Sequence, residues 1–143
     1  MARRPKGKSG SGKGRFVGVP HHVASSPQWC GLSAHEQKLL FDLSYFYNGS
    51  NNGNLTAAHA IMEVRGWTNG TLHRALKVIK EKGFVVVTRQ GWKQRGKATM
   101  LALTWHGIDE PPQHIEYDAG IKPDPVPLNY WNKPPEHWQN KPP

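Results

Sequence analysis

Hydrogen-bonding and basic side chains recur at helical spacing between residues 68 and 82. On a helical wheel, Leu72, Ala75, Leu76 and Ile79 fill a narrow apolar arc, and the opposite arc is polar and basic. Such a face can read base edges in a DNA groove, and arginine suits this best because it matches both acceptors of guanine. The alternative is a merely solvated helix face. The candidate DNA contacts in this helix are Thr68, Asn69, Thr71, His73, Arg74 and Lys77.

Two other basic segments could bind the phosphate backbone. The glycine-bracketed loop 91–97 holds three cations and no acid, and residues 1–15 hold six cations and no acid. The arm 1–15 either follows phosphates or enters a minor groove, or it is a solubilising tail. Trp92 either stacks on a sugar or base or, as we favour, packs on the base of its own hairpin. The candidate contacts are Trp92, Lys93, Arg95 and Lys97 in the loop and Arg3, Arg4, Lys6, Lys8, Lys13 and Arg15 in the arm.

Residue types suited to catalysis or metal binding lack the required spacing. The eight histidines are scattered and the ten carboxylates are sparse, so we expect no structural zinc, no cofactor and no enzymatic activity. Residues 7–13 fit the start of a phosphate-binding loop, but Gly14 stands where magnesium needs Ser or Thr, so we treat the match as chance. Cys30 is the single cysteine, and beside Trp29 we expect a buried thiol in a reducing compartment.

Three helices are predicted to position the candidate contacts. Ser33 and Glu36 form a capping box that predicts a first helix over 33–47. A second helix is predicted over 57–64, with Thr56 as its cap. We expect the second helix to bury Ile61, Val64 and one of its alanines.

The third predicted helix and a hairpin follow closely. Gly66 is expected to end the second helix in a left-handed conformation, and Thr68 is a good cap for the third helix over 68–82. After a stop at Gly83, the β-branched run 84–90 and the run 99–105 predict two antiparallel strands, with a brief strand contact at Leu55.

Composition separates a central domain from two terminal segments. The chain has 143 residues and a formal net charge of +9, with net +6 in 1–15, +3 in 68–83, +4 in 84–107 and −3 in 108–143. Nine of the twelve prolines lie in 111–143, where helical and strand periodicity stop. We therefore predict a flexible, disordered arm at 1–15, one domain at 16–107 and a Pro/Trp-rich tail at 108–143. Because neither a secretory signal nor an apolar run of membrane-spanning length is present, we expect a cytoplasmic protein without a membrane partner.

The predicted tail contains a near-duplication. Asn132 and Asn140 each begin an Asn-Lys-Pro-Pro run, and a tryptophan precedes each run. Such anchors beside polyproline suit a linear motif that docks on another protein. The alternatives are that the tail folds back over the domain or serves as a passive linker. The candidate protein-contact residues are Trp131, Pro134, Pro135 and Trp138.

The order of these elements resembles the winged-helix superfamily. More narrowly, segments 16–20, 32–33, 51–55, 83–84 and 103–105 resemble small winged-helix proteins encoded by bacteriophages, prophages and plasmids. The resemblance covers about residues 16–107, and Met62 departs from it by occupying a position that is usually small. It implies DNA binding in replication or transcription control.

We therefore expect an α+β winged helix-turn-helix, with three helices and a C-terminal hairpin wing, that binds double-stranded DNA. One helix-turn-helix reads a short site, so a homodimer is compatible with the sequence. A protein-interaction adaptor or inhibitor of a host complex that uses the tail, and a weaker RNA-binding reading, are the alternatives.

Overall fold

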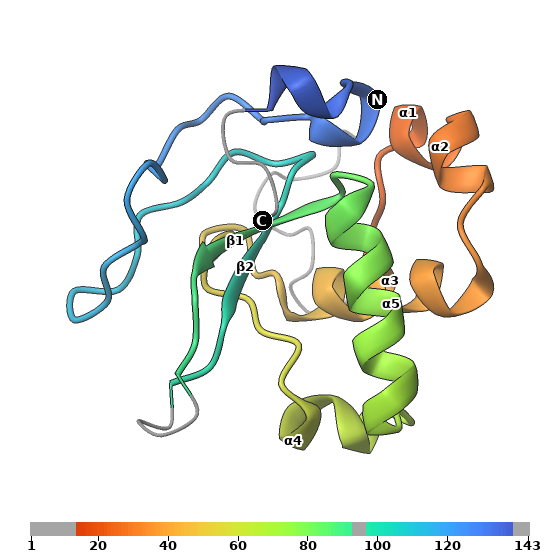
Figure 1. Cartoon of the computed structure of the whole chain (residues 1–143), viewed down its shortest axis with the longest axis horizontal. Coiled ribbons are helices and arrows are strands. Elements are labelled where there is room, and N and C mark those ends of the chain that lie inside the picture. The colour runs from red at the N-terminus through yellow and green to blue at the C-terminus, as the bar shows by residue number, and fades with distance from the viewer. Residues whose placement is uncertain (1–13, 93–96, 139–143) are drawn as a thin grey trace, which may run out of the picture.

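The computed structural model describes residues 14–92 and 97–138. These residues form a small α+β fold with five α-helices and a two-stranded antiparallel sheet (Figure 1). Short 3₁₀-helices complete the chain. The elements, in order, are α1 (His21–Ala24), α2 (Pro27–Cys30), α3 (Ala34–Phe46), α4 (His59–Met62), η1 (Glu63–Arg65), α5 (Asn69–Glu81), β1 (Val85–Arg89), β2 (Met100–Leu103), η3 (Tyr130–Asn132) and η4 (Pro135–His137).

The two longest helices, α3 and α5, pack against each other and supply much of the core. The predicted capping box opens α3: the Ser33 N–H donates to Glu36 Oε1 at 2.8 Å, and the Glu36 N–H donates to Ser33 Oγ at 3.2 Å. The apolar arc predicted for α5 is also found, because Leu72, Ala75 and Ile79 are buried. Both helices therefore follow their local sequence signals.

The sheet pairs β1 with β2 and has an irregularity between Val87 and Arg89. The predicted strand contact is present as a bridge between Leu55 and Leu101 of β2. Val85 and Leu103 face the helices in one apolar cluster, whereas Val86 and Ala102 face a second cluster on the other side. Both faces of the sheet are therefore covered, which suits the continuous apolar run in β1.

The second face of the sheet is covered by residues 108–138. Ile108, Ile121, Tyr130 and Trp138 are buried in the second cluster, and Trp131 joins the helical core. The Asp118 N–H donates to the Thr88 carbonyl oxygen at 2.7 Å, and the Asn129 N–H donates to the Thr104 carbonyl oxygen at 2.7 Å. The segment predicted to be a separate tail is thus the third layer of the fold, and we call residues 108–138 the strap.

The loop before the sheet is fastened by Asn52, which is fully buried. Its side-chain oxygen accepts from the Leu103 N–H at 2.7 Å, and its amide nitrogen donates to the carbonyl oxygens of Leu103 and Gly107 at 2.9 and 2.8 Å. A buried amide is stable only with such partners. The Asn52 carbonyl oxygen also accepts from the Asp109 N–H at 2.8 Å, so Asn52 ties the loop to β2 and to the start of the strap.

The second helix differs from its prediction in length, cap and buried face. It is one turn of α-helix, α4, continued by η1, and its N-cap is Ala58 without a side-chain bond. Met62 is fully buried, whereas Ile61 is 40% and Val64 is 85% exposed. The helix therefore turns Met62 toward the core in place of the predicted Ile61 and Val64.

One other expectation about the first thirty residues is wrong. Cys30 is exposed instead of buried, because α2 turns its C-terminal residue outward while Trp29 packs on Phe84 and Trp105. The turns α1 and α2 had no counterpart in the sequence prediction. Ser26 caps α2 by accepting from the Trp29 N–H at 3.1 Å.

Candidate nucleic-acid interface

The candidate recognition surface is built on the first turns of α5. Thr68 has an extended backbone and caps the helix, with its hydroxyl oxygen accepting from the Thr71 N–H at 3.4 Å. The Thr68 hydroxyl also donates to Thr71 Oγ1 at 2.9 Å, and Arg74 Nη2 lies 3.5 Å from the same oxygen. These contacts order the helix start and hold Arg74 close to it.

The outward face of α5 is open to solvent. Asn69, His73, Arg74 and Lys77 are all exposed, and Thr71 is half-buried. The Lys77 ammonium lies 3.6 Å from Glu81 Oε2, and both side chains are largely exposed. An exposed ion pair of this kind contributes only about 0–1 kcal/mol to stability. Lys77 can therefore leave Glu81 and contact a ligand at little cost.

The turn before α5 is locked by a buried carboxylate. Asp42 in α3 accepts from Lys38 Nζ and from the Trp67 indole N–H, both at 2.7 Å, and Arg65 Nη2 lies 2.9 Å from its second oxygen. Lys38 also donates to the Arg65 carbonyl oxygen at 2.8 Å. Gly66, with φ of +93°, provides the predicted left-handed bend between Arg65 and Trp67.

Asp42 remains ionised in this environment. Burial alone would raise the pKa of Asp42, but the hydrogen bonds from Lys38, Trp67 and Arg65 outweigh it and hold the pKa below its usual value. An ionised carboxylate can accept all three bonds at once. The direction in which α5 leaves the turn therefore depends on this Asp42 clamp, which sequence reasoning missed because Trp67 and Arg65 are far from Asp42 along the chain.

The hairpin closes with reciprocal backbone hydrogen bonds between Trp92 and Lys97, at 3.0 and 3.1 Å. Trp92 is 59% exposed, so it packs less on its own hairpin than we expected and leaves ring surface for a ligand. Lys97 is exposed as well. The other predicted wing contacts, Lys93 and Arg95, lie outside the described residues.

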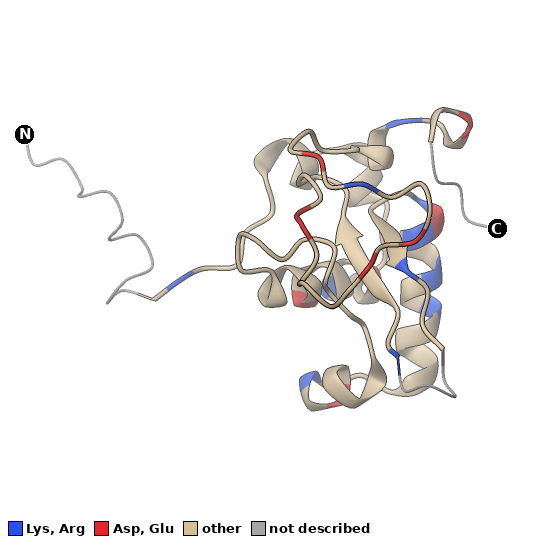
Figure 2. Cartoon of the chain, turned by 90° about the vertical axis from the view of Figure 1, so that its left-hand side faces the viewer, with Lys and Arg blue, Asp and Glu red and all other residues tan. Residues whose placement is uncertain are grey.

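The hairpin and the start of α5 lie at the same end of the molecule. In both views the strands leading to residues 92 and 97 run to the lower end, where α5 begins (Figures 1 and 2). In Figure 2 the lysines and arginines of α5 lie along one edge of the molecule, whereas most acidic residues of the strap lie on the loops in front of the sheet. This separation of charge would orient a polyanion toward α5 and the hairpin.

The arm enters the domain on the opposite side. In Figure 2 the described chain begins far from α5, with Arg15 as its first cation. The sequence had suggested that arm, helix and wing act together, but at its point of entry the arm does not share their face. The other predicted arm contacts, Arg3, Arg4, Lys6, Lys8 and Lys13, lie outside the described residues.

The residues proposed for protein contact divide into two pairs. Trp131 and Trp138 are each only 6% exposed, which contradicts their use as exposed anchors. Trp131 stacks on Phe84, and Trp138 stacks on Tyr130 at 5.2 Å and donates to the Lys133 carbonyl oxygen at 3.0 Å. Pro134 and Pro135 are exposed. The tryptophans belong to the core because they cover the otherwise open end of the sheet.

Two other kinds of site were sought within 14–92 and 97–138. In these ranges, no group of three or more His, Cys, Asp or Glu side chains is placed to hold a metal ion. The helices described there are all too short or too polar to span a bilayer. Comparison of the chain with protein-family models, with curated proteins and with solved structures gives no match.

Proposed function

We propose that this chain binds double-stranded DNA, with α5 in the major groove and the hairpin against the neighbouring backbone. The observation that carries the proposal is the exposed, unpacked face formed by Asn69, His73, Arg74 and Lys77 at the capped start of α5. Side chains at the start of a recognition helix are those that reach base edges.

The order of elements supports a winged-helix interpretation. Helix α3, the pair α4 and α5 around the left-handed Gly66, and the hairpin of β1 and β2 follow one another as in that superfamily. The bridge from Leu55 to β2 is the brief strand contact expected before the second helix. The strap is an addition to this plan, since it covers the face of the sheet that points away from the helices.

The proposed roles follow from side-chain chemistry. Arg74 reads guanine through two parallel hydrogen bonds, and Asn69 pairs with adenine. His73 and Lys77 contact bases or phosphates, and Lys97 neutralises a phosphate beside the hairpin. The role in replication or transcription control of a mobile element rests on the resemblance alone.

In vitro selection of bound duplexes followed by binding titrations tests this assignment. We expect Arg74→Ala to weaken binding to the selected site by about 1–3 kcal/mol and to relax the preference at one position. Lys97→Ala should weaken all sequences alike and lower the slope of log affinity against log salt by about 1. The matched control is Lys122→Ala, because Lys122 is exposed on the strap. If both test variants bind like the control, the surface is wrongly assigned.

The adaptor alternative loses its main support because Trp131 and Trp138 are buried. The RNA alternative depends on the basic arm and the basic wing and predicts equal affinity for duplex DNA and RNA. A titration with duplexes of both kinds at two salt concentrations separates it from the proposal.

A further inference from the structure

A pocket of about 360 Å³ lies between the start of the described chain and the C-terminal end of α3. Arg15, Phe16 and Val17 form one wall, and Tyr47 and Asn48 belong to the other. Its size is at the lower end of the range for small-ligand sites, about 300–1,000 Å³. No residue of the proposed duplex-binding surface lines it.

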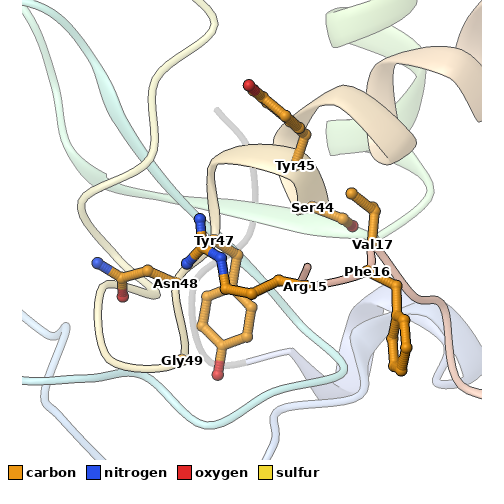
Figure 3. A pocket seen from close by; sticks show the side chains of 8 residues that line it. All are labelled: Arg15, Phe16, Val17, Ser44, Tyr45, Tyr47, Asn48 and Gly49. Carbon is orange, nitrogen blue, oxygen red and sulfur yellow. The ribbon is translucent and has the colours of Figure 1, made fainter. Parts of the chain in front are cut away.

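Two aromatic rings give the pocket its chemical character. Figure 3 shows the rings of Phe16 and Tyr47 on the same side of Arg15, with Tyr45 pointing the other way. Phe16 is 85% exposed, although such a ring would gain from burial. A flat apolar group inserted beside it would remove this surface from water.

Tyr47 is held rigidly at the end of α3. Its ring stacks on His106 with 4.4 Å between centroids and 23° between planes, and its N–H donates to the carbonyl oxygens of Leu43 and Ser44 at 3.2 Å. His106 covers one face of the ring, so the remaining surface lines the pocket. A stacking platform fixed in advance loses little entropy when a second ring binds.

The positive charge beside the pocket belongs to Arg15. Arg15 forms no hydrogen bond or ion pair with any other residue of the described ranges. The preceding residues 1–13 carry five more Lys and Arg and no acid. A ligand that combines flat rings with a chain of negative charges satisfies both features, and single-stranded nucleic acid is such a ligand. Duplex bases do not fit, because they are already stacked on their neighbours.

We propose that this pocket binds an unpaired base of single-stranded nucleic acid, with the base between Phe16 and Tyr47 and its phosphate on Arg15. Residues at the start of the described chain line the pocket, and in Figure 2 this start lies on the opposite side of the domain from α5. The site is therefore separate from the proposed duplex surface. The protein could hold a duplex and a single strand at the same time.

The test uses the full chain and fluorescence anisotropy with short labelled oligo(dT), oligo(rU) and an oligomer of abasic sites. We expect the base-bearing oligomers to bind more tightly than the abasic one. Phe16→Ala should weaken only the base-bearing oligomers, by about 5- to 150-fold, which corresponds to about 1–3 kcal/mol per stacked base. The tighter of oligo(dT) and oligo(rU) identifies the source of the strand.

Two variants make the result decisive. Phe41→Ala is the matched control, because Phe41 is a 45% exposed ring on α3 that does not line the pocket, and it should leave all three affinities unchanged. Arg74→Ala should leave single-strand binding intact, so failure of the duplex proposal is distinguished from failure of this one. Equal affinity for abasic and base-bearing oligomers, or an equal loss for both in Phe16→Ala, would overturn the pocket assignment.

Discussion

Replacing Asp42 by asparagine tests whether the Asp42 clamp holds the turn before α5. The substitution keeps the size of the side chain but removes its charge. Lys38 and Trp67 both donate to Oδ2, so the new amide oxygen could still accept from both, whereas the amide nitrogen would face Arg65 at the position of Oδ1. The hydrogen bond from Arg65 is therefore lost, and the hydrogen bond from Lys38 loses its charged acceptor.

The expected loss in the free energy of unfolding depends on how exposed the partners of Asp42 are. A hydrogen bond to a charged group contributes about 1.5–3 kcal/mol when it is buried. The Lys38 and Arg65 side chains are 45% and 25% exposed, so both cations regain hydration when the carboxylate is removed, and the loss is smaller. We expect Asp42→Asn to lower the free energy of unfolding by about 2 kcal/mol at neutral pH.

The pH dependence gives a second readout. The folded-state pKa of Asp42 lies below its unfolded-state value, so its stabilising contribution is complete above an unfolded pKa of about 3.9 and declines as the pH falls through the folded pKa. The difference between wild type and Asp42→Asn should shrink over this acid range. Because an amide does not titrate, the variant lacks this component of acid sensitivity.

Urea unfolding followed by tryptophan fluorescence, at pH 7 and at stepped values below pH 4, measures both quantities. The control is Glu81→Gln, which removes an exposed ion pair with Lys77 and should change stability by less than about 1 kcal/mol. A loss in Asp42→Asn no larger than in the control, or one independent of pH through the acid range, would refute the role given to the clamp.

The remaining predictions concern the strap. Trp138→Ala should lower the free energy of unfolding by about 3–5 kcal/mol in urea denaturation, because Trp138 is buried and stacked on Tyr130; a change below about 0.5 kcal/mol would mean that the strap is a passive tail after all. Gly83→Ala should destabilise by about 1–3 kcal/mol more than Gly49→Ala. Both glycines have positive φ, but a Cβ at Gly83 would lie 2.6 Å from Trp138 Cζ2 and 2.7 Å from the Tyr130 carbonyl oxygen, whereas nothing lies within 4 Å of a Cβ at Gly49. Equal melting temperatures for the two variants would contradict this packing.

Local signals in the sequence predicted α3, the bend at Gly66 and α5 well. The capping box of Ser33, the cap at Thr68 and the left-handed bend at Gly66 depend on neighbouring residues, and all three are present. The hairpin was also predicted, because the β-branched run in β1 is bounded by glycines. The open face of α5 followed from the helical wheel alone.

Long-range packing could not be predicted in the same way. No residue next to Asp42 in the sequence indicates that Trp67 and Arg65 contact it, and Met62 is buried through its packing in the core cluster. One available signal was overlooked. Val85, Val86 and Val87 form an unbroken apolar run, which is typical of a strand covered on both faces and implies a second covering layer from elsewhere in the chain.

The strap also has a consequence for the synthesis of the chain. Long stretches of chain already separate Asp42 from Trp67 and Leu55 from Leu101, and the contacts of Trp138 at Gly83 and of Trp131 on Phe84 are of the same kind. The strap differs in its position, because it follows the helices and the hairpin that it covers. During synthesis, α5 and the hairpin are made well before the residues that cover the back of their sheet, and that apolar face remains open in the meantime.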